Sequence, residues 1–233
     1  MEQKPATAIV TGGTGALGSV IVSHLRRQGL NVAVPVREPS SGTRQRDRET
    51  GVFYAPADLT SETQVRDFYA GVATSCGPVK ILVNAAGGYV GGVPLEEVQI
   101  GDWEAALAMN LTSCFLMSRE ALRIMKRSGS GRIINIAAMT ALAPEAGKAP
   151  YAVAKRGVIT LTESMAAEVR GTDITVNANA PGVIRTEANR AWMTKEMEAK
   201  SVPPEEIASL VLFLCSEDAR SINGNTIMIG RGA

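Results

Sequence analysis

Tyr151 and Lys155 lie four residues apart in the segment YAVAK, which reads as part of a helix. Residues with this spacing share one helix face, so the phenol and the ammonium point along the same groove. A nearby cation favours the phenolate of a tyrosine, which predicts that Lys155 adjusts Tyr151 for proton exchange near neutral pH. The pair alone is weak evidence, because a tyrosine and a lysine so spaced usually just share a solvated surface.

A glycine-rich turn upstream strengthens this interpretation. The segment TGGTGALG, from Thr11 to Gly18, follows the strand-like run ATAIV and opens a helix near Leu17. Glycines let the backbone approach a pyrophosphate, and the first N–H groups and dipole of the helix favour its negative charge. An ordinary glycine-rich turn is the alternative. Together the two motifs predict a dinucleotide beside a tyrosine acid, and therefore proton and hydride chemistry.

These motifs resemble the short-chain dehydrogenases/reductases, whose pattern TGxxxGxG is matched by Thr11, Gly12 and Gly18, with Ala16 at the middle glycine. The resemblance spans nearly the whole chain and implies an NAD(P)-dependent oxidoreductase acting on a small molecule. It implies that Tyr151 and Lys155 are catalytic and that Asn110 supports proton supply, although Asn110 could equally be an ordinary helix asparagine. The cofactor contacts that it implies come from Gly12, Thr14, Gly15, Leu17, Gly18, Arg37, Asp58, Leu59, Asn84, Ala85, Gly87, Tyr151, Lys155, Pro181, Gly182, Ile184 and Thr186.

The end of the second expected strand bears on the choice of cofactor. Val36 and Arg37 stand where an NAD site would carry an acid for the ribose 2′-hydroxyl. Arg37 could face a 2′-phosphate instead, so NADP is the favoured cofactor and NAD the alternative. The arginines of the following loop are more simply interpreted as solvated: Arg44, Arg46 and Arg48.

Ala138 stands thirteen positions before Tyr151, where the resembling family usually carries a catalytic serine. Its methyl group cannot donate a hydrogen bond to a substrate carbonyl, and losing one such donor costs about 10²–10³ in rate. Thr140 is an alternative source of a hydroxyl. Three hypotheses compete: a weakened carbonyl reductase, a cofactor-binding sensor or scaffold protein, and an enzyme whose substrate does not need the serine.

The third hypothesis is favoured by a local resemblance to dihydropteridine reductases, carried by GALGS, AGGYVGG and the short segment after the sixth strand. That branch also has alanine in place of the serine. A quinonoid dihydropterin presents a conjugated imine system, for which a tyrosine proton and a hydride could suffice. Val36 and Arg37 depart from the acidic NADH pattern of that branch.

Short apolar runs rich in β-branched residues alternate with helix-patterned stretches along the chain, which predicts an α/β fold. We expect a three-layer, doubly wound parallel sheet of Rossmann type with about seven strands. Long helices are expected at 102–127, with Phe115 on its apolar face, at 151–169, and after Pro204. The segment 37–51 is expected to be a surface loop with one helical turn. The strand-like runs are ATAIV, NVAVPV, VKILVN, GRIINIA, DITVNANA and NTIMIG.

The composition limits the remaining possibilities. A chain of 233 residues with 45% hydrophobic side chains fits one domain spanning 1–233, and a net charge of +1 argues against a nucleic-acid partner. Three scattered cysteines and one histidine indicate neither a metal site nor a disulfide framework. Without an apolar stretch of about 20 residues we expect no membrane span and a cytoplasmic protein. The family resemblance implies a homodimer or homotetramer.

Overall fold

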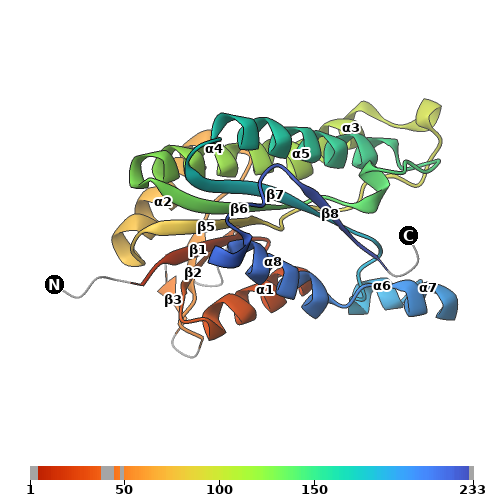
Figure 1. The fold of residues 1–233 in the computed structure, drawn as a ribbon. Helices are drawn as coiled ribbons and strands as arrows, with labels where there is room; N and C mark the ends of the chain where they lie inside the picture. The colour runs from red at the N-terminus through yellow and green to blue at the C-terminus, as the bar shows by residue number, and fades with distance from the viewer. Residues whose placement is uncertain (1–4, 38–44, 48–49, 231–233) are drawn as a thin grey trace.

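The computed structural model describes residues 5–37, 45–47 and 50–230 of the chain. Its centre is a sheet with the strand order β3-β4-β2-β1-β5-β6-β7-β8, in which β3 runs antiparallel to β4 and the other neighbours are parallel (Figure 1). The doubly wound parallel sheet is therefore confirmed. The strands are β1 Thr7–Thr11, β2 Asn31–Val36, β3 Gln45–Arg46, β4 Phe53–Pro56, β5 Val79–Asn84, β6 Ser130–Ile136, β7 Asp173–Pro181 and β8 Thr226–Ile229.

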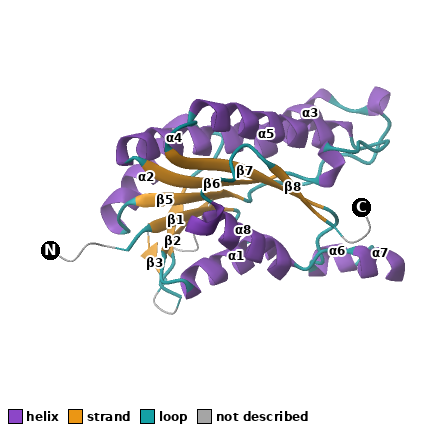
Figure 2. Ribbon diagram, in the orientation of Figure 1, coloured by secondary structure: helices purple, strands orange, loops and turns teal. Residues whose placement is uncertain are grey.

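Two layers of helices cover the sheet (Figure 2). One face packs on α1 and α8, and the other on α2, α4 and α5. Because both faces are buried, the parallel strands are apolar along most of their length. The helices are α1 Ala16–Arg27, α2 Glu62–Ser75, α3 Ile100–Leu107, α4 Ser113–Ser128, α5 Ala149–Glu168, α6 Glu187–Arg190, α7 Lys195–Lys200 and α8 Pro204–Cys215, with short 3₁₀ turns at Leu95–Glu97, Met139–Ala141 and Glu217–Ala219.

The long helix expected at 102–127 is interrupted. A π-helical segment at Ala108–Thr112, which contains Asn110, separates α3 from α4. Such π segments often occur at functional sites because the wider turn redirects a side chain. The apolar face was also predicted incorrectly at Phe115, whose side chain is 41% exposed. The Arg119 guanidinium lies 5.2 Å from the centre of the Phe115 ring, so this aromatic packs under a charged side chain at the surface.

The segment 37–51 also differs from its expectation. In its described part, Gln45 and Arg46 form the edge strand β3 and pair with β4, where one helical turn was expected. Arg44 and Arg48 lie outside the described residues. The strand β4 is a short apolar segment, FYAP, whose residues alternate between buried and more exposed positions.

A buried polar network fixes the carboxyl ends of the central strands. Asn84 and Asn135 occupy paired positions on β5 and β6, and Asn84 Nδ2 donates to Asn135 Oδ1 at 2.8 Å. Asn84 Nδ2 also donates to Ser118 Oγ at 2.9 Å, and Asn135 Nδ2 donates to Thr162 Oγ1 at 2.8 Å. These hydrogen bonds connect two strands with α4 and α5. They also turn the Asn84 side chain into the core, so any cofactor contact from this residue would come from its backbone.

Candidate active site

The predicted site residues gather at one edge of the sheet. Arg37, the glycine turn, the loop from Asn84 and the loop from Pro181 each follow the carboxyl end of a strand, in the order β2, β1, β5 and β7. The chain leaves β1 toward one side of the sheet and returns through β5 on the other, so the strand order reverses between these two strands, where a doubly wound sheet opens a crevice. In open α/β sheets such a crevice is where ligands bind.

The glycine turn is closely packed at this crevice. Gly12 has φ +65°, and a Cβ there would lie 2.9 Å from the Ala86 backbone. A Cβ on Gly18 would lie 2.1 Å from the carbonyl oxygen of Gly12, so a side chain at either position would force the turn open. The Ala86 N–H donates to Thr11 Oγ1 at 3.0 Å, which ties this turn to the loop after β5.

The start of α1 fits an anion. Within the part of the chain that the structure describes, no side chain caps the helix at Gly15 and no acidic residue lies in its first turn. The first N–H groups of an α-helix have no partner within the helix, and its dipole makes this end positive. The arrangement suits a pyrophosphate beside Thr14, which is exposed, and Leu17, which packs against the core.

Asp58 and Arg37 lie beyond the crevice, after β4 and β2. The backbone N–H and the hydroxyl of Thr60 donate to Asp58 Oδ1 at 2.9 and 2.7 Å. These bonds lower the pKa of the carboxyl, and the Arg37 charge lowers it further. Arg37 is exposed, and Leu59 packs against the core beside Asp58. This end of the site therefore offers both a carboxylate and a guanidinium.

Tyr151 and Lys155 occupy the first turns of α5. Lys155 is 5% exposed, and its ammonium donates to the carbonyl oxygen of Ile136 at 2.8 Å. Desolvation lowers the pKa of Lys155 to about 8. Lys155 Nζ lies 5.8 Å from the centre of the Tyr151 ring. Burial raises the pKa of Tyr151, opposite to the direction expected from the neighbouring lysine. Tyr151 is thus a neutral phenol at neutral pH and suits proton donation.

Asn110 points from the π-helical segment toward the same place. Its Nδ2 donates to the Gly88 carbonyl at 3.0 Å, and the Gly88 N–H donates to Asn110 Oδ1 at 3.2 Å. A Cβ at Gly87 would lie 2.6 Å from Asn110 Oδ1 and 3.2 Å from Lys155 Nζ. Asn110, Lys155 and the loop at Gly87 therefore converge. The Asn110 amide is bonded to the backbone of this loop, and a part for Asn110 in proton supply stays a prediction.

The position of the missing serine is apolar. Ala138 has extended backbone, is 7% exposed and precedes the turn Met139–Ala141. The Met139 sulfur lies 3.4 Å from where a Cβ on Gly182 would be, so a thioether faces the start of the loop after β7. Thr140 is half-buried in the same turn.

The loop after β7 is held by hydrogen bonds. Gly182 N donates to the Ile229 carbonyl at 2.8 Å, and Ile184 pairs with Val202. The Thr186 hydroxyl accepts from Asn189 N at 3.1 Å and so caps α6. This loop is a rigid rim of the site, and the Thr186 side chain has a structural role within it.

Sequence reasoning missed two contributors to the site. The first is the Ile136 carbonyl, which binds Lys155. The second is Tyr89, whose ring lies 5.5 Å from the Tyr151 ring, centre to centre, at 66°. The segment AGGYVGG was noticed for its resemblance, but no periodicity places its tyrosine beside Tyr151.

The described residues form neither a membrane-spanning helix nor a metal-binding cluster. Among the described residues, no helix is long and apolar enough to cross a membrane. The described chain also holds no group of three His, Cys, Asp or Glu side chains arranged around a common point for a metal ion.

Comparison with known proteins gives consistent matches. The family model described as short chain dehydrogenase matches residues 6–197. The chain is 34% identical over 242 residues to 3-oxoacyl-[acyl-carrier-protein] reductase of Vibrio cholerae, covering 100% of this chain and 98% of the relative. It is 33% identical over 234 residues to acetoacetyl-CoA reductase of Rhizobium meliloti, covering 97% of each.

A solved structure agrees with these relatives. The chain superimposes with a TM-score of 0.86 on a variant of actinorhodin polyketide ketoreductase crystallised with NADPH. The two are 30% identical, and the match covers 98% of this chain and 97% of the other. The match therefore extends over nearly the whole chain.

Replacing Lys155 by Met tests the buried ammonium. The folded pKa of about 8 lies below the usual 10.5, so between these values the unfolded chain holds a proton that the folded protein lacks, and stability rises with pH. From pH 8 to pH 10.5 the free energy of unfolding of wild type should rise by about 3 kcal/mol more than that of Lys155→Met. Urea unfolding at these two pH values measures the difference. Lys195→Met replaces an exposed lysine and is the control, and its stability should depend on pH as that of wild type does. Parallel pH dependence of wild type and Lys155→Met would contradict the assignment.

Proposed function

Since the chain belongs to the short chain dehydrogenase family, we propose that it is an NAD(P)H-dependent reductase in which Tyr151 donates the proton. The observation that carries this proposal is the convergence of Tyr151, the buried Lys155 and the Gly87 loop at the crevice that the glycine turn borders. A neutral phenol is the protonation state that a reduction requires of its acid.

The chain's own residues would divide the work as follows. The turn from Gly12 to Gly18 binds the pyrophosphate with backbone N–H groups, and Arg37 and Asp58 receive the adenosine end. A bound nicotinamide supplies the hydride. Tyr151 gives its proton to the oxygen or nitrogen of the acceptor, and the Lys155 ammonium stabilises the phenolate that remains. Asn110 keeps the Gly87 loop open beside them and supports the return of a proton to Tyr151.

We favour an acceptor that is already polarised. The relatives are named for reductions of acetoacetyl and 3-oxoacyl groups, which makes a ketone the first alternative. Ala138 and Met139, however, supply no hydroxyl to orient a carbonyl. A conjugated imine, as in a quinonoid dihydropterin, needs only the proton and the hydride. This is the more specific proposal for the substrate.

A non-catalytic role is the second candidate function. Ala138 supports it, because a sensor or scaffold protein needs the cofactor site and not the serine. Such a protein would bind the cofactor without turnover of any acceptor. The two candidates therefore differ in one measurable property.

We also propose a homodimer or homotetramer that assembles through α4 and α5. Each helix presents a large apolar side chain to solvent, Phe115 at 41% and Val153 at 45% exposure. Apolar side chains of this kind are commonly covered when subunits associate.

Tyr151→Phe tests the proton donor. Removing the hydroxyl removes a general acid, so turnover should fall by about 10²–10⁴ while NADPH binding is retained. Cofactor oxidation should be followed over ketones, quinones and quinonoid dihydropterin, with binding followed by NADPH fluorescence. The control Tyr54→Phe, on β4, should keep full turnover. Undiminished turnover in Tyr151→Phe would show that the mechanism is wrong.

Ala138→Ser separates the acceptor classes. If the acceptor is a conjugated imine, the added hydroxyl finds no role, and reduction of ethyl acetoacetate should gain nothing. A gain on this ketone approaching 10²-fold, which is about the contribution of one oriented donor, would instead mark a dormant carbonyl reductase. The measurement is kcat/KM for quinonoid dihydropterin and for ethyl acetoacetate, in wild type and in Ala138→Ser.

Arg37→Gln tests the cofactor preference. Loss of a charge-assisted bond to a 2′-phosphate should weaken NADPH binding about 10-fold and leave NADH binding nearly unchanged. The control Arg170→Gln, beyond the far end of α5, should alter neither dissociation constant. A wild-type preference for NADH, or equal weakening of both cofactors, would refute the role of Arg37.

A further inference from the structure

Tyr89 is a large aromatic side chain in the loop after β5, next to the proposed acid. Its ring and the ring of Tyr151 lie in an edge-to-face arrangement, with 5.5 Å between their centres and 66° between their planes. The Tyr89 side chain nevertheless remains 56% exposed. An aromatic ring that is open to solvent therefore packs against the ring of the proposed acid.

The loop that carries Tyr89 is held on both sides. Before it, the backbone of Gly88 exchanges two hydrogen bonds with the Asn110 amide. After it, Gly92 N donates at 2.7 Å to the carbonyl oxygen of Gly147, just before α5 begins. Tyr89 and Tyr151 thus belong to two segments that are bonded to each other, so their relative position is set by the fold.

The hydroxyl of Tyr89 points back to its own loop. A Cβ on Gly91 would lie 2.8 Å from Tyr89 Oη and 2.7 Å from the Gly147 carbonyl oxygen, which explains a glycine at this position. The ring, and not the hydroxyl, is what Tyr89 presents near Tyr151. This orientation therefore favours a role for Tyr89 in packing against a ligand over a role in proton transfer.

A hollow of about 220 Å³ lies on the other side of the loop. It is lined by the Tyr89 ring together with Val93, Val98, Asp102 and Pro150. Pro150 immediately precedes Tyr151, so this hollow borders the start of α5, next to the proposed acid.

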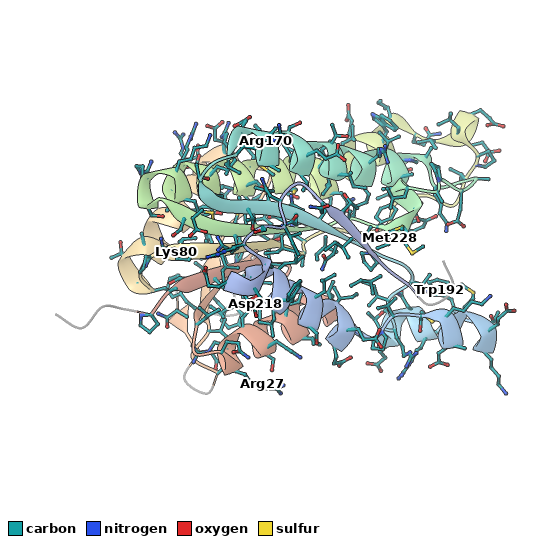
Figure 3. The ribbon with its side chains drawn as sticks, in the orientation of Figure 1. Arg27, Lys80, Arg170, Trp192, Asp218 and Met228 are labelled. Carbon is teal, nitrogen blue, oxygen red and sulfur yellow. The ribbon has the colours of Figure 1, made fainter. Side chains whose placement is uncertain are left out.

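The turn after β6 carries an apolar residue, Ala138, at the position where the family usually has a serine. Ala138 leaves Tyr151 without the partner hydroxyl that would orient an acceptor. Exposed apolar side chains occur in the loops after β6 and β7, namely Leu142, Val183 and Trp192. Trp192 lies in the turn that follows α6 (Figure 3). A small ketone can rotate about a single hydrogen bond, whereas a flat ring stacked on an aromatic wall cannot.

We propose that Tyr89 is a specificity-determining residue, whose ring stacks against flat, conjugated acceptors and holds them with the reacting atom at the Tyr151 hydroxyl. The proposal rests on the proposed reductase function and narrows its substrate to planar conjugated acceptors such as quinones or quinonoid heterocycles. Flexible aliphatic ketones lack the flat face that this contact requires.

The test compares two acceptors in Tyr89→Ala and Tyr89→Phe. Menadione is a flat quinone and ethyl acetoacetate is a flexible ketone. Loss of one aromatic contact should raise the KM for menadione about 3–10-fold in Tyr89→Ala, with a smaller effect on kcat. The ratio of kcat/KM for menadione to that for ethyl acetoacetate should fall by a similar factor. Tyr89→Phe should restore both values, because the ring carries the contact.

Binding gives a readout that does not depend on turnover. The flat phenol 1-naphthol, which accepts no hydride, should bind about 3–10-fold more weakly to Tyr89→Ala than to wild type, measured by quenching of tryptophan fluorescence in the presence of NADPH. Leu95→Ala, at an exposed neighbouring position, is the matched control and should bind 1-naphthol as wild type does. Thermal unfolding checks that each variant is folded.

Two outcomes would overturn the proposal. In one, Tyr89→Ala weakens both acceptors equally or leaves their ratio unchanged. In the other, Tyr89→Phe behaves as Tyr89→Ala does. If wild type reduces neither acceptor, the reductase function fails for these substrates, and the 1-naphthol affinities alone then decide whether Tyr89 binds flat rings.

Discussion

The burial of the Lys155 ammonium is the constraint on which the candidate active site depends. A charge removed from water is tolerable only when polar groups surround it, and here the Ile136 carbonyl at the end of β6 accepts its hydrogen bond at 2.8 Å. That bond joins α5 to the sheet one turn below Tyr151. The neighbouring end of β6 is held in turn by Asn135, through Asn84 and Thr162. The position of the Tyr151 side chain thus follows from polar contacts made in the interior.

Asn110 links a local irregularity in a helix to this arrangement. An uninterrupted α-helix over 102–127 would distribute its side chains differently, whereas the π-helical segment at Ala108–Thr112 lets the Asn110 amide meet the Gly88 backbone. The loop so held passes Lys155 at Gly87 and continues to Tyr89. One helical irregularity therefore positions both the space beside the lysine and the ring beside the tyrosine.

Much of the fold could be predicted because it depends on local patterns. NVAVPV and VKILVN coincide with β2 and β5, since strands buried on both faces are apolar throughout. The strand β4 was not among the strand-like runs, because a segment of four residues is too short to show a clear pattern. The helices expected near Leu17 and at 151–169 are observed as α1 and α5. Other features depend on segments that are distant in sequence, so a short stretch of residues does not predict them. These features are the π-helical segment, the exposure of Phe115, the raised pKa of Tyr151 and its contact with Tyr89.

The backbone at Ala138 has a consequence for how such a protein can diverge. This residue lies at the end of a strand in ordinary extended conformation, with only a methyl group projecting, and the polar network behind β6 does not include it. The side chain at this position can therefore change without breaking the hydrogen bonds that hold β6 to its neighbours. Substitution here is compatible with an unchanged core, so this position can vary while the fold is kept.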